Sequence, residues 1–250
     1  MLYGGHVRSK DDIDFLQSTG FEFGEVVIRS ETSRDYWRHS GTRNNGRPDF
    51  LLIAHGPFEG PPNDIDNLWS KYYPALRDTI DVARIMEICF LTIHLWMDPR
   101  FVKAEVIREK KRALSDLFHY GHDNGVFVSL ENLSETADDF AGVLELIPEL
   151  GITLDVGHGQ LLTRTNTSFE IVDKLMGSIK HVHFHDNRGG RGVKDDLHLP
   201  IGDGIVDFKG ILKILLEKGY HHTLTLELEN KDLIESRAKV KALIDDIENP

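Results

Sequence analysis

The sequence predicts a single (β/α)8 barrel domain over residues 1–250. Eight short β-rich segments alternate with helical segments along the chain, which is the pattern of parallel βαβ units. The length of 250 residues agrees with the roughly 250 residues that such a barrel needs. A doubly wound open sheet is the alternative, but it would usually carry a glycine-rich phosphate motif after an early strand. Gly4-Gly5 is too short to be such a motif.

The expected strands are segments rich in β-branched and aromatic residues. They cover residues 2–5, 21–28, 50–55, 89–95, 126–131, 152–156, 181–185 and 223–228. No low-complexity segment and no linker divides the series. The strands therefore belong to one continuous structural unit.

Helical patterns separate most of these strands. They cover residues 11–19, 65–86, 102–120, 137–147, 169–176, 211–217 and 233–247. Within the second of these helices, Pro74 is expected to cause a kink or a break. Asp207 is a suitable N-cap for its helix, and Gly219 is a suitable residue just beyond the C-terminus of the same helix. Residues 29–48 are mostly polar, and we expect a long loop there.

The composition excludes several classes of protein. The 40% hydrophobic and 28% charged residues are ordinary for a globular protein. The 29 basic and 41 acidic residues give a net charge of −12, which disfavours non-specific binding of nucleic acid. No apolar run is long enough for a transmembrane helix, and the N-terminus lacks the apolar core of a signal peptide. The single cysteine, Cys89, excludes an internal disulfide framework and favours a cytoplasmic location.

Imidazole and carboxylate side chains occur where the expected strands end. These residues are His55, His94, Glu131, Asp155, His158, His183, Asp196, His198 and Glu227. The carboxyl ends of barrel strands meet around one axis, where the active sites of this fold are built. Each residue alone could have an ordinary structural role. Such roles do not explain why six separate strands end in an imidazole or a carboxylate. Buried carboxylates are costly unless a cation neutralises them, so the pattern predicts a divalent metal site.

The donor types narrow the choice of metal. Imidazole and carboxylate without thiolate suit Zn²⁺ or Mn²⁺, with Fe²⁺ and Co²⁺ as alternatives, better than Ca²⁺ or Mg²⁺ alone. On the seventh expected strand, alternation places His181, His183 and His185 on one face. We expect His181 to be buried and hydrogen-bonded, and His185 to contact the substrate or support a ligand. The pair His221-His222 precedes the eighth strand and is interpreted as structural.

Six stretches in this order resemble the xylose isomerase-like barrel superfamily, which includes sugar isomerases, epimerases and the endonuclease IV family. They are AHGPF (54–58), LENLSE (130–135), LDVGH (154–158), HFHD (183–186), DLHLPIGDGIVDF (196–208) and LTLELEN (224–230). For epimerase-like members, the resemblance implies one metal bound by Glu131, Asp155, His183 and Glu227. For endonuclease IV-like members it implies three metals, with His55, His94, His158, Asp196 and His198 as the further ligands. All nine positions hold suitable residues, which favours a multinuclear site.

The chain departs from endonuclease IV at three of these places. That family typically shows His-Pro-Gly where this chain has His94-Leu-Trp-Met, and Asp-Thr-Cys-His where it has Asp155-Val-Gly-His158. Its Glu-Thr-Pro is replaced here by Glu227-Leu-Glu-Asn. Phe58 matches an aromatic residue that contacts DNA in that family, although a core aromatic residue would fit equally well. The chain is therefore not a typical member of the repair family.

Two mechanisms are compatible with this site, and a phosphoester hydrolase is narrowly favoured. In the hydrolase, several metals would activate water and stabilise the phosphoryl oxygens. In the alternative, a one-metal sugar or sugar-phosphate isomerase or epimerase, Glu131 and Glu227 would exchange protons at neighbouring carbons and His158 would orient the substrate. These three residues are the candidate catalytic residues. A non-catalytic metal- or sugar-binding barrel is a third hypothesis.

Basic residues favour a small anionic substrate, either a phosphorylated sugar or a phosphodiester, and leave nucleic acid open. Residues 29–48 contain Arg29, Arg34, Arg38, Arg43 and Arg47 together with Tyr36 and Trp37, and the loop after the seventh strand adds Arg188, Arg191 and Lys194. The candidate substrate-binding residues are Arg34, Arg38, Trp96, His185, Arg188 and Arg191. A solvated loop, balanced by its own acidic residues, is the alternative for residues 29–48.

Overall fold

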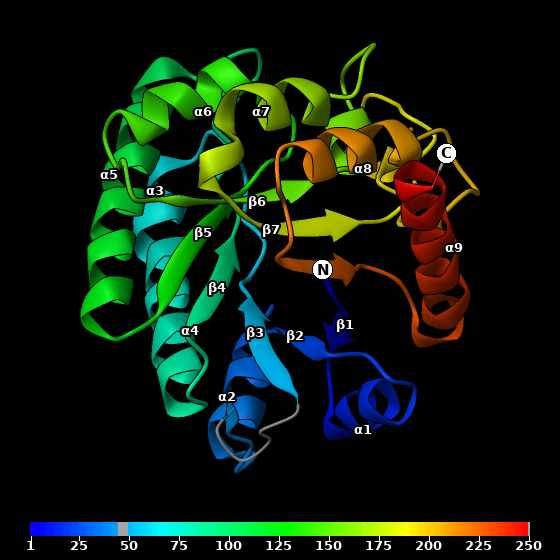
Figure 1. Cartoon of the computed structure of the whole chain (residues 1–250). Helices are drawn as coiled ribbons and strands as arrows, with labels where there is room; N and C mark the ends of the chain where they lie inside the picture. Colours follow the sequence, from blue (N-terminus) through cyan, green and yellow to red (C-terminus); the bar gives the residue numbers. More distant parts are fainter. Residues whose placement is uncertain (45–49, 250) are drawn as a thin grey trace.

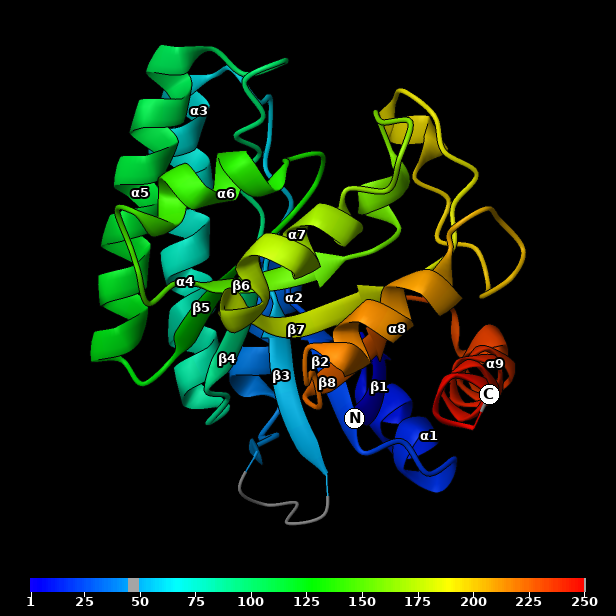
Figure 2. The ribbon, with the colours of Figure 1, turned by 45° about the horizontal axis from the view of Figure 1, so that its top comes forward.

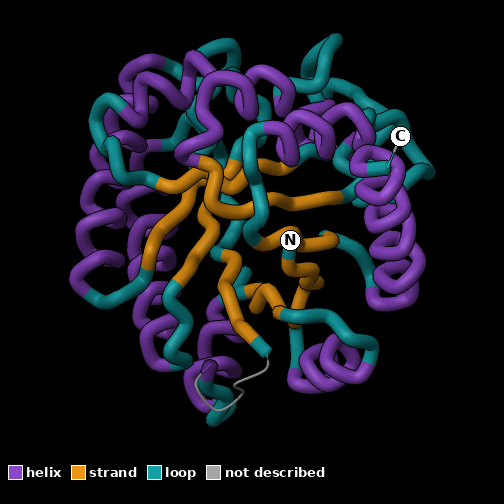
Figure 3. The backbone as a smooth tube through the Cα atoms, viewed as in Figure 1, coloured by secondary structure: helices purple, strands orange, loops and turns teal. Residues whose placement is uncertain are grey.

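The computed structural model describes residues 1–44 and 50–249. Eight parallel strands close into a barrel in chain order, with β8 paired to β1, and the helices surround it (Figures 1 and 3). The strands are β1 Leu2–Val7, β2 Phe23–Val27, β3 Leu51–His55, β4 Phe90–Ile93, β5 Phe127–Glu131, β6 Gly151–Asp155, β7 Ile179–Phe184 and β8 Thr223–Leu226. The predicted (β/α)8 barrel is confirmed.

The main helices follow the strands around the outside of the barrel. They are α1 Lys10–Ser18, α2 Glu31–His39, α3 Ile65–Asn67, α4 Tyr73–Ile85, α5 Ala104–Asp123, α6 Ala137–Leu144, α7 Ser168–Leu175, α8 Phe208–Glu217 and α9 Asn230–Glu248. No break occurs at Pro74, because the chain stays helical from α3 to α4; the predicted irregularity takes the form of a π-helical turn, Leu68–Tyr72, and Pro74 lies in the first turn of α4. Asp207 caps α8 by accepting a hydrogen bond from the Gly210 N–H, and Gly219 follows that helix with a φ of +80°.

The prediction of a continuous loop over residues 29–48 is wrong, because α2 forms within it. Ser30 and Ser33 cap its N-terminus with reciprocal side-chain to backbone hydrogen bonds, a capping box in which serine replaces the usual Glu or Gln at the third helical position. The Trp37 side chain is completely buried, which anchors the helix to the core. Residues 45–49, which include Arg47, lie outside the described residues.

Aromatic residues fill the amino-terminal end of the barrel interior. The rings of Phe23 and Phe90 pack edge-on against the buried His181 imidazole, and Phe90 stacks on Phe127. Gly4 makes room for this packing, because a Cβ at that position would lie 2.3 Å from the Phe23 ring. The interior is therefore a packed core below the site, as expected for this fold.

A layer of buried hydroxyl groups lies among the strands that carry the polar cluster. The Thr153 hydroxyl lies 3.0 Å from that of Thr92 and 2.9 Å from that of Ser129. His181 contacts the hydroxyls of Thr223 and Thr225 at 2.7 and 3.0 Å, which confirms that it is buried and hydrogen-bonded. These bonds satisfy polar groups that would otherwise be costly to bury.

The loops after β6 and β7 rise from the barrel side by side (Figure 2), and the Leu162 N–H donates to the Gly190 carbonyl at 2.9 Å. The Asp186 carboxylate accepts hydrogen bonds from the backbone N–H groups of Gly202, Gly204 and Val206. A Cβ at Gly204 would lie 2.3 Å from Asp186 Oδ1. The aspartate of HFHD thus fixes the shape of the loop that contains the GDG sequence.

We predict that α2 contributes strongly to stability through one side chain. Trp37→Ala should lower the free energy of unfolding by about 3–5 kcal/mol, because it empties a fully buried aromatic site. Tyr36→Ala is the matched control, because the neighbouring Tyr36 is 43% exposed and should cost less than about 1 kcal/mol. Urea denaturation measures both. Equal costs would contradict the burial of Trp37.

Candidate metal centre

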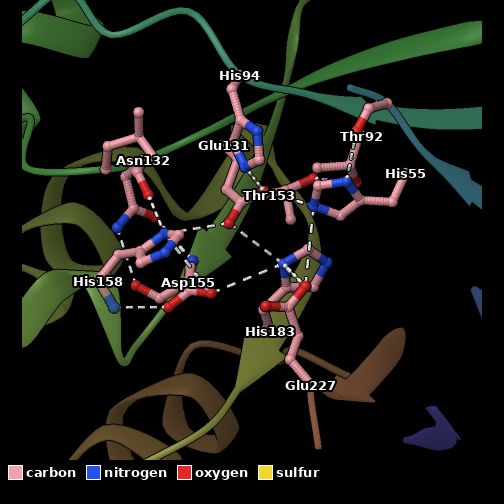
Figure 4. Close-up of polar contacts among 12 residues, drawn as sticks. His55, Thr92, His94, Glu131, Asn132, Thr153, Asp155, His158, His183 and Glu227 are labelled. Atoms are coloured by element: carbon pink, nitrogen blue, oxygen red, sulfur yellow. Dashed lines mark hydrogen bonds and ion pairs between the residues drawn. The ribbon is translucent and has the colours of Figure 1, made fainter. Parts of the chain in front are cut away.

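Four carboxylate and imidazole side chains converge at the carboxyl end of the barrel. His183 Nδ1 lies 3.4 Å from Glu131 Oε1, 3.7 Å from Asp155 Oδ2 and 3.2 Å from Glu227 Oε1. Figure 4 shows these groups facing one another from neighbouring strands. The four residues that the one-metal resemblance implies are therefore brought together around a single point.

Glu25, a residue that sequence reasoning missed, orients His183. Its carboxylate on β2 lies 3.1 Å from His183 Nε2 and 3.3 Å from His181 Nε2, and all three side chains are fully buried. The Nε2–H of His183 can donate to Glu25, which leaves Nδ1 directed at the other carboxylates. A carboxylate that holds the far nitrogen of a histidine in this way is typical of metal sites.

His6, on β1, is a second residue that was missed. Its Nε2 lies 2.8 Å from Glu227 Oε1, so it fixes the carboxylate that β8 presents. The signal for both residues was present in the sequence, because Glu25 and His6 are polar residues among the apolar residues of the first two strands.

A second donor group adjoins the central one. His55 Nε2 and His94 Nε2 lie 3.1 and 2.9 Å from Glu131 Oε2. His55 is the last residue of β3 and His94 follows β4 directly. Glu131 thus contacts this pair through one oxygen and the central group through the other (Figure 4).

A third donor group forms where the loops after β6 and β7 meet. His158 Nε2 and His198 Nε2 lie 3.3 and 3.2 Å from Asp196 Oδ2. His185 stacks on His198 with ring centres 3.9 Å apart, and its Nε2 lies 3.0 Å from Asp155 Oδ1. The structure therefore places all nine predicted metal ligands in three contiguous groups and adds His185 to the third.

Several buried polar atoms in these groups form no hydrogen bond of suitable geometry with a described residue, although they lie close to one another. They are both ring nitrogens of His94, Glu131 Oε1, His183 Nδ1 and His185 Nδ1. Unpaired buried nitrogen and oxygen atoms that face one another would be satisfied by a cation. The imidazole and carboxylate donors fit Zn²⁺, Mn²⁺ or Fe²⁺, so the residues present suit the predicted divalent metals.

The cluster is strongly polarised. Burial alone would raise the pKa of the Glu131 carboxyl, but the charges of His94 and His183 outweigh it and hold that pKa well below its usual range. Burial would lower the pKa of His183, but Glu25, Glu227 and Glu131 raise it well above its usual value. At His198, Asp196 and Glu227 overcome burial and raise the pKa to about 9. In the metal-free cluster, protonated His183 and His198 therefore compensate the carboxylates at neutral pH, whereas burial lowers the pKa of His94.

The candidate substrate-binding residues lie in different environments. Arg34 and Arg38 on α2 both pair with Asp78 on α4, so the structure holds them within the helix layer. Trp96 follows β4, and its indole N–H donates to the Ser134 hydroxyl at 2.8 Å. The side chains of Arg188 and Arg191 are exposed on the loop after β7. Of this set, only His185 joins the donor groups, and the substrate contacts remain predictions.

Residues 13–248 match the family model described as the xylose isomerase-like TIM barrel. The chain belongs to this family. It is 29% identical over 221 residues to an uncharacterized protein of Methanocaldococcus jannaschii, covering 80% of this chain and 72% of that protein. It is 25% identical over 164 residues to a probable endonuclease 4 of Thermotoga maritima, covering 58% of this chain and 56% of that enzyme. This chain thus spans only a little over half of the endonuclease.

Solved structures show the same fold. A D-tagatose 3-epimerase-like protein superposes with a TM-score of 0.78 at 24% identity, covering 99% of this chain and 98% of that one. A second solved structure, which holds a zinc atom, superposes with a TM-score of 0.73 at 12% identity, covering 100% of this chain and 100% of that one. Among the described residues, none of the helices combines the length and apolar character that crossing a membrane requires.

We predict that Gly157, in the LDVGH stretch, is required for the position of His185. A Cβ at Gly157 would lie 2.1 Å from the His185 ring, although the backbone φ of −70° suits alanine. Gly157→Ala should therefore destabilise the metal-free protein by about 1–3 kcal/mol through overpacking. Gly177→Ala is the control, because its Cβ would meet no atom within 4 Å. If urea denaturation gives the two variants equal stability, this packing constraint is refuted.

We also predict that metal binding releases protons. The imidazole that binds a metal must be neutral, whereas the carboxylates raise the pKa of His198 to about 9. Metal affinity should therefore increase with pH up to about 9. In the metal-free protein the same raised pKa stabilises the folded state fully below pH 6.5, and this contribution is lost as pH rises through about 9. Calorimetry in buffers of different ionisation enthalpy measures the protons, and a buffer-independent heat would contradict the prediction.

Proposed function

We propose that this chain is a multinuclear, divalent-metal-dependent phosphoester hydrolase of the endonuclease IV type. The observation that carries the proposal is the shared position of Glu131. One of its oxygens contacts His55 and His94, and the other lies 3.2 and 3.4 Å from His158 and His183. A carboxylate placed between adjacent donor groups is suited to a site that holds more than one cation.

The third donor group supports the same reaction class. Asp196 contacts His158 and His198, and His198 Nδ1 lies 3.4 Å from Glu227 Oε2, so the third group adjoins the central group. A one-metal site needs only the central group, with His158 to orient the substrate, and leaves Asp196 and His198 without a chemical role. Two or three divalent ions would supply Lewis-acid stabilisation of a phosphoryl group and would lower the pKa of water.

Neighbouring side chains hold the candidate ligands in position and exclude water from the centre of the site. Glu25 and His6 hold His183 and Glu227 in place through contacts of 3.1 and 2.8 Å. Glu131 is buried and Glu227 is nearly so, so bulk water is excluded from the centre and electrostatic interactions there are strengthened. The partly exposed third group, in which the His198 side chain is 31% exposed, gives the substrate access from the loop side.

A sugar or sugar-phosphate isomerase or epimerase is the second candidate. It is favoured by the approach of Glu131 and Glu227 to the same nitrogen of His183, at 3.4 and 3.2 Å. Two carboxylates that face one point could exchange protons at neighbouring carbons of a sugar. His158 lies beside them and would orient the substrate.

Metal stoichiometry and one pair of variants test the proposal. Protein prepared without chelator should contain two or three divalent ions per chain by elemental analysis. Asp196→Asn should lose about one ion and about a hundredfold or more of the turnover of a phosphodiester that contains an abasic site. Asp203→Asn removes an exposed carboxylate of the same loop and should change neither quantity.

One equivalent of metal, together with full activity of Asp196→Asn on a free or phosphorylated sugar, would reject the hydrolase and support the isomerase. Both mechanisms require Glu131, so Glu131→Gln should abolish turnover in either case. A folded protein that binds metal and acts on neither substrate class would support a binding role instead.

A further inference from the structure

A cavity of about 280 Å³ opens beside the central donor group. Its walls include His198 and Glu227, which belong to the candidate metal centre, and Arg8 and Arg29, which follow β1 and β2. Leu197, 41% exposed, adds an apolar edge. The cavity therefore lies between the candidate metal centre and two arginines that have no role in the proposed reaction.

Arg29 is held at the mouth of the barrel by backbone pairing and by an aromatic ring. The preceding residue, Ile28, donates its N–H to the His55 carbonyl at 2.8 Å, which places Arg29 next to a metal-donor strand. Its guanidinium carbon lies 4.2 Å from the centre of the Phe58 ring. Phe58 in turn stacks on His94 with ring centres 5.3 Å apart. The guanidinium is thus positioned by a cation–π contact.

Arg29 forms no close ion pair with any described residue. Its Nε is buried and has no hydrogen-bond partner, and no carboxylate oxygen of the described residues comes within 4.0 Å of its guanidinium. Burial lowers the pKa of Arg29; the negative charge of Glu227 partly offsets this effect, and the like charge of Arg8 lowers the pKa further. Arg8 itself has only a 3.5 Å contact with the exposed Glu229, and such a surface pair is weak. An anion between the two arginines would give the unpaired guanidinium of Arg29 a partner and would offset the repulsion between the two positive charges.

We propose that Arg29 and Arg8 form a phosphate-binding subsite in this cavity, with Phe58 as the positioning residue of Arg29. The subsite receives a phosphate of the substrate next to the candidate metal centre, and to that extent it rests on the proposed function. Phosphate fits because the planar guanidinium offers paired donors that match its oxygens. Arg34 and Arg38 differ, because Asp78 already neutralises them.

Binding of inorganic phosphate tests the subsite without requiring turnover. Calorimetry is done at low salt on the protein as purified and again after chelator treatment, because bound metals also attract phosphate. Arg29→Gln should weaken binding about tenfold to a hundredfold in both preparations, as expected for loss of a hydrogen bond to a charged group. Arg29→Lys should retain part of the affinity, and Phe58→Leu should show an intermediate loss. Arg108→Gln, on the exposed side of α5, makes the same charge change and should have no effect.

The source of the phosphate is distinguished by three further ligands: ribose, ribose 5-phosphate and a dinucleotide with a single phosphodiester. Both phosphate-bearing ligands should bind more tightly than ribose in the wild-type protein, and this advantage should disappear in Arg29→Gln. The tighter of the two identifies the natural source of the phosphate.

Equal binding of inorganic phosphate by Arg29→Gln and the wild-type protein would overturn the subsite, as would equal binding of ribose and ribose 5-phosphate. Phosphate affinity that disappears with the metal and is unchanged by Arg29→Gln would place the anion at the metals alone and would also overturn it. None of these results depends on cleavage of a phosphoester, so failure of the subsite and failure of the proposed hydrolase are separate outcomes.

Discussion

The central constraint on this molecule is the burial of carboxylates in the middle of a barrel. Glu25, Glu131 and Asp155 are within 1% of complete burial, and Glu227 is 4% exposed. Ionised carboxylates cannot remain there without cationic partners. Imidazoles from neighbouring strands supply them in the metal-free protein, and divalent ions are expected to take over that role. The register of the strands is thereby tied to chemistry, because a shift by one residue would turn each group away from the axis.

The layers below the carboxylates follow from the same constraint. Strand side chains alternate between the interior and the helix layer. The side chain two residues before each central polar group therefore also points into the interior, one layer below that group. Hydroxyls at Thr92, Ser129 and Thr153 form a hydrogen-bonded layer, and the phenyl rings of Phe23 and Phe127 belong to the aromatic packing at the amino-terminal end. The interior thus changes from apolar to hydroxyl to ionic, which limits how deeply unpaired charge is buried.

The sequence predicted the barrel and its nine gathered donors because both depend on local patterns, namely strand periodicity and polar residues at strand ends. The sequence did not reveal His6, because the expected first strand ended at Gly5. It did not reveal Glu25, because a glutamate within an apolar strand, rather than at its end, does not fit the pattern that identified the other donors. The helix α2 was missed because its cap uses Ser33. The ion pairs of Arg34 and Arg38 depend on Asp78, some forty residues away, a tertiary contact that no local pattern encodes.

The two candidate reactions differ in the part of the site that is built on loops. The central group stands on β5, β6, β7 and the end of β8, whereas Asp196 and His198 lie on the loop after β7. That loop is held by Asp186, whose carboxylate needs glycine at position 204 for close backbone approach. A single carboxylate at the end of β7 therefore connects the barrel to the third donor group. Loops on a rigid scaffold are where barrels of one family diverge in function. Here the GDG sequence holds the loop that carries Asp196 and His198, the two donors that a one-metal centre does not need.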